Sequence, residues 1–248
     1  HLEHRRQRQM CIRDSNTIMS EELTSLIEDL SMSSDNIRSI ILTGSGEKAF
    51  CAGGDLKERN GMSDDDWKKQ HLVYERMIRA LIGCPIPIIG AINGAAFGGG
   101  CEIAAALDFV YVSENAKFAL PELGLGIIPG AGGTQTLSRA VGERRAKELI
   151  LTGRVFTAQE AVKWNLANDI FPVDKLLDET IKIAELISSK APIAVKQAKQ
   201  SIHKGLQMSL SDGLSFEIEA YNRTIPTKDR IEGVLAFNEK RKPKFKGK

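Results

Sequence analysis

The stretch that decides the fold is FGGGCEIAAALDF, residues 97–109. Three consecutive glycines, Gly98 to Gly100, are followed by Cys101, Glu102 and an apolar run that is typical of a helix. Glycine loses more backbone freedom on folding than any other residue. Three in succession therefore indicate a turn at which the backbone closely approaches another group, and Glu102 falls where the helix after that turn begins.

Two further glycine-rich turns follow apolar stretches: CAGGDL at 51–56 and IPGAGGTQ at 128–135. Backbone N–H groups at glycine can face a ligand without a Cβ in the way, and those at a helix start carry the positive end of the helix dipole. Donors from the Gly53–Gly54 and Gly98–Gly100 turns, aimed at one point, would stabilise an oxyanion. The alternative is that all three turns are tight connections without a chemical role.

Two carboxylates lie among these turns. Glu102 follows the three glycines, and Glu122 follows Pro121 in LPELGLGIIPG. Each has a structural explanation, since Glu is favoured in the first turn of a helix and Pro-Glu is a common helix start. Together, in apolar surroundings, they form a candidate general acid/base pair.

The composition limits the classes of protein to consider. Of the 248 residues, 42% are hydrophobic, which is enough for a sizeable core. Because 34 basic and 32 acidic residues nearly cancel, the net charge of +2 gives no general argument for nucleic acid or an anionic membrane. Four cysteines and four histidines lack the spacing of zinc ligands, so we expect reduced thiols and no metal. The absence of an 18-residue apolar run predicts no membrane-spanning helix.

Hydrophobic periodicity predicts alternating strands and helices as far as Gly133, and mostly helices after it. Strands are predicted at 37–44, 85–94 and 169–172, with further short strands within 108–120. Helices are predicted at 21–31 with Ser20 as the N-cap, and at 64–84, 101–109, 134–153, 157–168, 174–190, 191–205, 209–225 and 228–242. This pattern favours an α/β core of about 170 residues followed by a helical C-terminal part.

Four sequence blocks, in order along the chain, resemble one enzyme family. They are FCAGGDLKE (50–58), NGAAFGGGCEIAAALDF (93–109), PELGLGIIPGAGGTQTLSR (121–139) and RTIPTKDRIEGVLAFNEKRKPKFKGK (223–248). The first three closely resemble the enoyl-CoA hydratase (crotonase) superfamily, and the fourth is most similar to its methylglutaconyl-CoA hydratase branch. The similarity extends from about Asn16 to Lys248.

The resemblance implies an α/β fold with a repeated ββα spiral core at 15–187 and a C-terminal helical region at 188–248 that builds trimers, commonly paired into hexamers. It implies a hydro-lyase that adds water across the C2=C3 double bond of an acyl-CoA thioester. Coenzyme A is then part of the substrate, and no separate cofactor is expected. The substrate implied first is 3-methylglutaconyl-CoA, and the alternative is a short-chain enoyl-CoA of fatty-acid oxidation.

The resemblance also assigns the reacting groups. The two oxyanion donors of the family fall on the N–H groups of Gly54 and Gly99, although the first position is more usually alanine. The two hydratase glutamates fall on Glu102, assigned as the base that activates water, and on Glu122, assigned as the acid that protonates C2. Gly130 would line the pocket close to the water.

Binding residues follow from the same resemblance. Backbone groups near Ala52 and Gly53 would contact the adenine of CoA, while Phe237 and Lys240 would approach CoA from a neighbouring subunit. The distal carboxylate of methylglutaconyl-CoA requires a cation, for which Lys57 and Arg59 are candidates. The alternative for these two is a solvated helix start or further contacts to CoA phosphates.

The N-terminal segment HLEHRRQRQMCIRD (1–14) has no apolar region typical of a secretory signal and is expected to take no part in the fold. Family members usually begin with a β-hairpin, and this segment lacks the alternation of its strands. We therefore expect a core sheet that lacks one or two strands and exposes an edge. A cytoplasmic location is the default prediction, and the mitochondrial matrix is the alternative.

Two basic segments raise other possibilities. EKRKPKFKGK (239–248) is either a solvated tail or a phosphate contact. Some relatives are described as RNA-binding, and the segment 188–205 carries four lysines, but no aromatic residues lie among them to stack on bases. RNA binding on the same fold is thus an alternative function of a different class, and nucleic acid is not the expected partner.

Overall fold

The structure, a computed structural model, describes residues 16–32, 37–46 and 48–248. Its strands are short, and most are separated by helices. The strands are β1 (Ile40–Thr43), β2 (Ala49–Cys51), β3 (Ile88–Ile92), β4 (Ala95–Phe97), β5 (Phe109–Ser113), β6 (Lys117–Ala119), β7 (Phe156–Thr157) and β8 (Asp169–Phe171). The helices are α1 (Thr17–Met32), α2 (Leu56–Arg59), α3 (Asp64–Gly83), α4 (Gly99–Ala106), the 3₁₀ turn η1 (Glu122–Leu125), α5 (Gly133–Val141), α6 (Glu143–Thr152), α7 (Ala158–Lys163), α8 (Leu176–Ser188), α9 (Pro192–Gly205), α10 (Leu210–Asn222) and α11 (Lys228–Asn238).

The strands form two four-stranded sheets, with the orders β1-β3-β5-β8 and β2-β4-β6-β7. From β1 to β6, consecutive strands enter different sheets, and each of the pairs β1–β2, β3–β4 and β5–β6 leads into a helix. All neighbouring strands are parallel except β6 and β7. This confirms the predicted α/β fold with a ββα spiral.

The predicted exposed sheet edge falls at β1, which within the described residues pairs with β3 alone. The segment 1–14, in which the family's first strands would be sought, lies outside the described residues. The prediction that this segment takes no part in the fold therefore stays a prediction.

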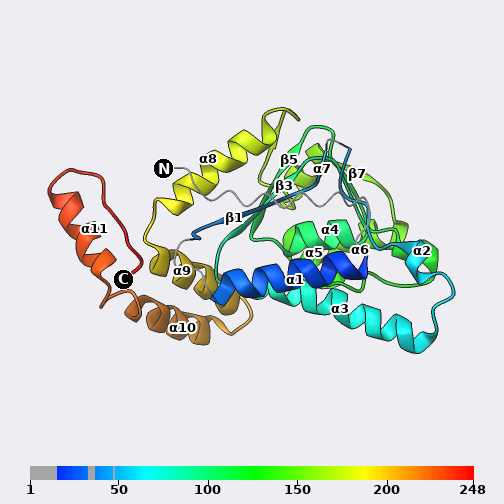
Figure 1. Ribbon diagram of the computed structural model, residues 1–248, viewed down its shortest axis with the longest axis horizontal. Helices are drawn as coiled ribbons and strands as arrows, with labels where there is room; N and C mark the ends of the chain where they lie inside the picture. Colours follow the sequence, from blue (N-terminus) through cyan, green and yellow to red (C-terminus); the bar gives the residue numbers. More distant parts are fainter. Residues whose placement is uncertain (1–15, 33–36, 47) are drawn as a thin grey trace.

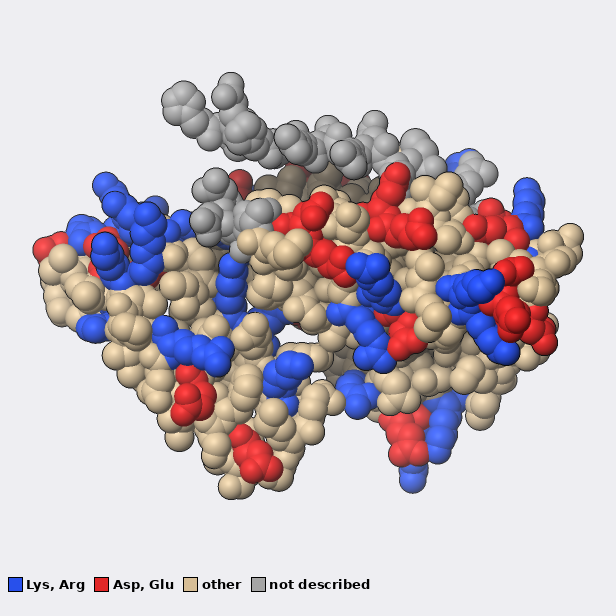
Figure 2. Space-filling model, turned by 60° about the horizontal axis from the view of Figure 1, so that its bottom comes forward, with Lys and Arg blue, Asp and Glu red and all other residues tan. Residues whose placement is uncertain are grey.

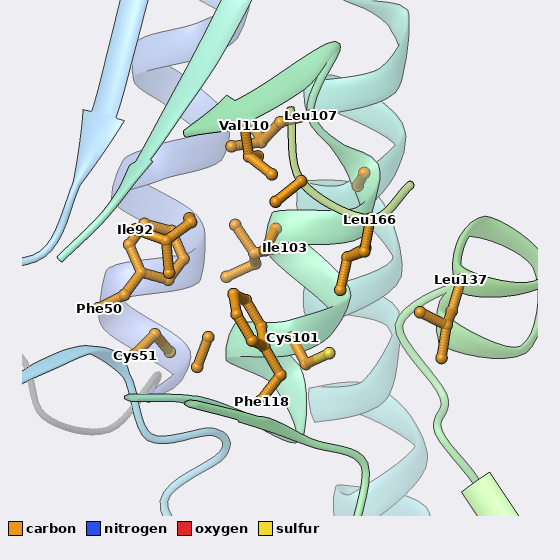
Figure 3. Packing of buried hydrophobic residues seen from close by; sticks show 14 of the residues in the cluster. Phe50, Cys51, Ile92, Cys101, Ile103, Leu107, Val110, Phe118, Leu137 and Leu166 are labelled. Carbon is orange, nitrogen blue, oxygen red and sulfur yellow. The ribbon is translucent and has the colours of Figure 1, made fainter. Parts of the chain in front are cut away.

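Helix α4 runs through the centre of the core, which explains why residues 101–107 are almost entirely apolar. Cys101 and Ile103 are buried, and Figure 3 shows them packed among Phe50, Ile92 and Phe118 from the surrounding strands. A helix that is apolar on most of its faces is stable only when other elements surround it. The buried position of Glu102 in its first turn is therefore set by the whole core.

The start of the first helix differs from the prediction. Helix α1 begins at Thr17, and the Asn16 side chain accepts a hydrogen bond from the N–H of Met19 at 2.9 Å. Ser20, predicted as the N-cap, lies inside the helix with its hydroxyl donating to the carbonyl of Asn16. The N-cap prediction was wrong because Ile18 and Met19 belong to the helix and the apolar period begins earlier than Leu23.

Three strands and a helix break were not predicted. Strands β2, β4 and β7 have two or three residues each, too few to show an alternating pattern. The predicted helix at 134–153 is two helices, α5 and α6, separated at Gly142, which has a φ of 80°. The predicted helix at 157–168 ends at Lys163, just before Asn165 adopts a φ of 65°.

The last three helices, α9 to α11, extend away from the core. Helix α8 packs on the β1-β3-β5-β8 sheet, whereas α9, α10 and α11 follow one another away from it, and α10 packs on α9 (Figure 1). Lys199 of α9 links this part to the core: its ammonium lies 2.6 Å from Asp108 and donates to the carbonyl of Ile86. Both side chains of this ion pair are largely buried.

The basic C-terminal segment is held against α11 by its backbone. Asp229, which is buried, accepts hydrogen bonds from the N–H groups of Lys246 and Gly247, both at 2.7 Å. The guanidinium of Arg38 donates to the carbonyl of Phe245 at 2.8 Å. The lysine side chains of this segment remain exposed. Elsewhere acidic and basic side chains are interspersed over the face shown in Figure 2.

Candidate active site

The two glycine turns predicted to supply oxyanion donors are in contact. A Cβ built on Gly53, whose φ is +100°, would lie 2.9 Å from the carbonyl oxygen of Phe97 and 3.6 Å from the nitrogen of Gly99. Gly99 is the first residue of α4, so its N–H is one of the donors without an intrahelical acceptor. The Gly53–Gly54 turn and the start of α4 therefore meet at one place.

Glu102 is held in a fixed orientation by the third glycine turn. Its Oε1 accepts hydrogen bonds from the N–H groups of Ala131 and Gly133, both at 2.8 Å. A Cβ on Gly133 would lie 2.9 Å from that oxygen, so only glycine permits this approach. The side chain is 4% exposed. Burial raises its pKa from 4.5 to about 7, partly opposed by the hydrogen bond from Gly133.

Glu122 opens η1 and is also buried. Its Oε1 lies beside Gly98, where an added Cβ would be 3.1 Å away, and Gly98 has a φ of +51° that favours glycine. Its Oε2 is buried and has no hydrogen-bond partner among the described residues. Burial raises the pKa of this carboxyl as well. An unpaired buried carboxyl oxygen is costly, which is typical of a functional group rather than a structural one.

Both carboxyls and both glycine turns line one cavity of about 910 Å³. Helix α3 contributes Trp67, His71 and Tyr74 to the lining, which also includes Pro129 and Gly130. Sequence reasoning missed the α3 side chains. Their helical spacing was visible, but that spacing is equally typical of a helix that simply packs on the core.

Of the two predicted cations, Arg59 lines the cavity, whereas Lys57 is exposed and lies outside its lining. The Arg59 guanidinium lies over the rings of Trp67 and Tyr74, at 4.5 and 5.3 Å from their centroids. Its Nε donates to Gln70 Oε1 at 2.8 Å. These contacts hold the guanidinium beside Gly54 in a fixed position.

The other predicted binding residues divide into two groups. Ala52 and Gly53 line the cavity, and so does Gly130. Phe237 and Lys240 lie near the end of α11, outside the cavity lining; Phe237 is 84% exposed, and Lys240 has a φ of 54°. Their predicted approach to CoA from a neighbouring subunit stays a prediction.

Within the described residues, no cluster of His, Cys, Asp and Glu is arranged to hold a metal ion, and no helix is both long and apolar enough to span a membrane. Cys51, Cys84 and Cys101 are buried, and none of these three described cysteines is in a disulfide. Two buried carboxyls with raised pKa values beside two glycine turns form a candidate site for acid–base chemistry.

Comparison with known proteins identifies a family whose members carry out acid–base chemistry of this kind. The family model for enoyl-CoA hydratase/isomerase matches residues 9–248. The YngF protein of Bacillus subtilis is 48% identical over 229 residues, which cover 92% of this chain and 88% of YngF. The short-chain-enoyl-CoA hydratase of Clostridium acetobutylicum is 43% identical over 206 residues, covering 83% of this chain and 79% of that protein.

Among solved structures, an enoyl-CoA hydratase from Bacillus anthracis superposes with a TM-score of 0.91 at 47% identity, over 93% of this chain and 89% of that one. The chain belongs to the enoyl-CoA hydratase/isomerase family. The prediction of a hydro-lyase is thereby confirmed at the level of a general hydratase, while the preference for 3-methylglutaconyl-CoA stays a prediction.

Proposed function

We propose that the chain adds water across the C2=C3 double bond of a short-chain 2-enoyl-CoA thioester. The observation that carries this proposal is the pair Glu102 and Glu122, two buried carboxyls that line one cavity beside the Gly53–Gly54 turn and the start of α4. The family membership and the name of the Clostridium relative support the same reaction and chain length.

The proposed reaction begins with the thioester oxygen between the N–H groups of Gly54 and Gly99. As hydroxide adds to C3, the double-bond electrons move onto that oxygen to form an enolate. Backbone donors aimed at such an oxygen are typically worth about 10²–10³ in rate each. Because residue 54 would bind the thioester oxygen through its backbone N–H, it needs no side chain, and glycine is compatible with this role.

The two carboxyls carry the protons. Glu102 takes a proton from water while the new C–O bond forms at C3, and Glu122 donates a proton to C2 as the enolate collapses. Glu102 accepts two backbone hydrogen bonds at one oxygen, so its other oxygen is available to the water. The raised pKa of Glu122 keeps that carboxyl protonated over a wider pH range, as an acid requires.

The first experiment follows the loss of enoyl-thioester absorbance with crotonyl-CoA. We expect rapid loss with the wild type and a decrease of at least about 10²-fold in each of Glu102→Gln and Glu122→Gln, because a general acid or base is worth about 10²–10⁴. A Glu114→Gln variant, at an exposed position, is the control. Near-native rates in Glu122→Gln would rule out its assignment as the acid.

A second candidate substrate, 3-methylglutaconyl-CoA, is favoured by the position of Arg59 in the cavity, since a guanidinium pairs with a carboxylate in a bidentate manner. If Arg59 receives the distal carboxylate, Arg59→Ala should lower kcat/KM for 3-methylglutaconyl-CoA by at least about tenfold more than for crotonyl-CoA. Lys57→Ala, outside the cavity, is the matched control. Equal losses for both substrates would contradict the carboxylate role.

A further inference from the structure

His71 lies on the face of α3 that forms the cavity wall. It is four residues after Trp67 and three before Tyr74, so all three side chains project from the same side of the helix. Its side chain is half-buried, and the reaction proposed above gives it no role. It is nonetheless close to the site, because it contacts the loop that orients Glu102.

The contact is with Gly130, one residue before Ala131. A Cβ built on Gly130 would lie 2.5 Å from Cε1 of His71, 3.3 Å from Nδ1 and 3.5 Å from Nε2. The imidazole therefore lies directly on the backbone of Gly130. It joins α3 to the loop before α5 and occupies the space between them, next to the N–H that holds Glu102.

Apolar residues next to this contact in the chain also line the cavity: Leu72 follows His71 on α3, and Ile128 lies two residues before Gly130. Leu72, Leu125 and Ile128 line the cavity and are 62%, 54% and 67% exposed. Exposed leucine and isoleucine side chains in a cavity mouth offer surface on which an alkyl chain can be buried. The strip formed by these three residues would suit the distal part of a longer acyl chain, provided that the chain could reach it from Glu102 and Glu122.

We propose that His71 sets the upper limit of acyl-chain length by closing the route between the two glutamates and the Leu72–Leu125–Ile128 strip. This inference rests on the proposed enoyl-CoA substrate and adds the element that selects its length. The imidazole excludes longer chains in two ways. Its bulk fills the gap above Gly130, and its ring nitrogens would lose hydration against buried methylenes.

The test compares crotonyl-CoA with 2-octenoyl-CoA in the wild type and in His71→Ala. Burying one methylene corresponds to about a fourfold gain in kcat/KM, so access of two or more methylenes to the strip predicts a rise of at least about tenfold in the octenoyl-to-crotonyl ratio. His71→Phe, which keeps the bulk of the ring but removes its nitrogens, should raise the ratio by less than His71→Ala does. His203→Ala, at an exposed histidine of α9, is the matched control.

A binding measurement separates this proposal from the proposed function. Calorimetry with butyryl-CoA and octanoyl-CoA, which cannot be hydrated, gives the ratio of their dissociation constants in each variant. If the wild type hydrates no enoyl-CoA, the hydratase proposal fails, yet this ratio still tests His71. Preferential tightening of octanoyl-CoA in His71→Ala supports the length limit. An unchanged ratio, or an equal change in His203→Ala, would overturn it.

Discussion

At Gly100, the close approach predicted from three consecutive glycines is with strand β2. An added Cβ would overlap the carbonyl oxygen of Cys51 and lie 2.9 Å from its Cβ. The two neighbouring glycines have other roles. Gly98 has a positive φ and lies beside Glu122, and Gly99 is the first residue of α4, where its N–H has no intrahelical acceptor. One three-residue run thus combines packing, backbone conformation and a hydrogen-bond donor.

Replacement of Gly100 by alanine should therefore destabilise the fold. We expect Gly100→Ala to lower the free energy of unfolding by about 1–3 kcal/mol or more, because β2 must move away from α4. Gly83→Ala is the matched control, since Gly83 is also helical and a Cβ there would meet nothing within 4 Å. Urea denaturation of both variants checks this, and equal stabilities would show that the contact with Cys51 is not tight.

The raised pKa of Glu102 predicts how activity depends on pH. A base must be ionised, so kcat/KM for crotonyl-CoA should fall as the pH decreases through about 7, the value to which burial raises the pKa. The check is a pH–rate profile between pH 5 and 9, in which each unit below the pKa costs about tenfold. A profile that stays level down to pH 5 would exclude Glu102 as the base.

The same carboxyl predicts a dependence of stability on pH. Because its pKa is higher in the folded state than the ordinary 4.5, its contribution to stability is complete below about 4.5 and is lost as the pH rises through about 7. Glu102→Gln removes the charge. Its Tm should therefore exceed that of the wild type by more at pH 8 than at pH 5. A difference in Tm independent of pH would show that burial of the charge has no cost.

At the scale of elements, α9 is joined to the core by Lys199. Its ammonium pairs with Asp108, which also accepts a hydrogen bond from the N–H of Ile88 at 2.7 Å, the first residue of β3. Asp108 therefore connects α9 with the start of a central strand. The pair is 12% and 24% exposed, so water replaces the lost partner poorly when one member is removed.

Lys199→Met should lower the free energy of unfolding by about 1–3 kcal/mol, since it leaves Asp108 without its cation while keeping the apolar stem. Lys204→Met, on the same helix at an exposed position, should change stability by less than about 0.5 kcal/mol. Thermal denaturation of the two variants, side by side, is the measurement. Equal Tm values would mean that the pair contributes nothing to the attachment of α9.

At the scale of the whole molecule, the projecting helices carry apolar side chains that the chain itself does not cover. On α10, Leu210, Leu214, Ile218 and Tyr221 recur at helical spacing and are 80%, 53%, 59% and 66% exposed. Such a contiguous apolar stripe is typical of a subunit interface. It supports the prediction of a homotrimer or hexamer from the family resemblance.

We expect sedimentation analysis of the wild type to give a mass of three or six chains. The double variant Leu214→Asp/Ile218→Asp should have the mass of one chain. Assembly through the stripe would bury its two introduced carboxylates in the subunit interface. Ser215→Asp, on the same helix outside the stripe, should leave the mass unchanged. A monomeric wild type would contradict the oligomer prediction.

The sequence by itself determined the class of fold and the residues of the candidate site. The apolar run after Gly100 predicted a helix, and three glycine turns with Glu102 and Glu122 among them pointed to an oxyanion site with an acid/base pair. These features are local: they depend on periodicity, on glycine conformation and on residue type, all of which are present in the sequence. The similarity of the blocks then identified the family.

Tertiary structure alone decided which distant groups meet. The contacts of Glu102 with Ala131 and Gly133, of His71 with Gly130, and of Lys199 with Asp108 join residues that the sequence separates by 29 or more positions. The shortest strands, β2, β4 and β7, were likewise set by pairing with neighbouring strands. Sequence patterns report what one element prefers, whereas pairing and burial depend on elements that fold onto one another.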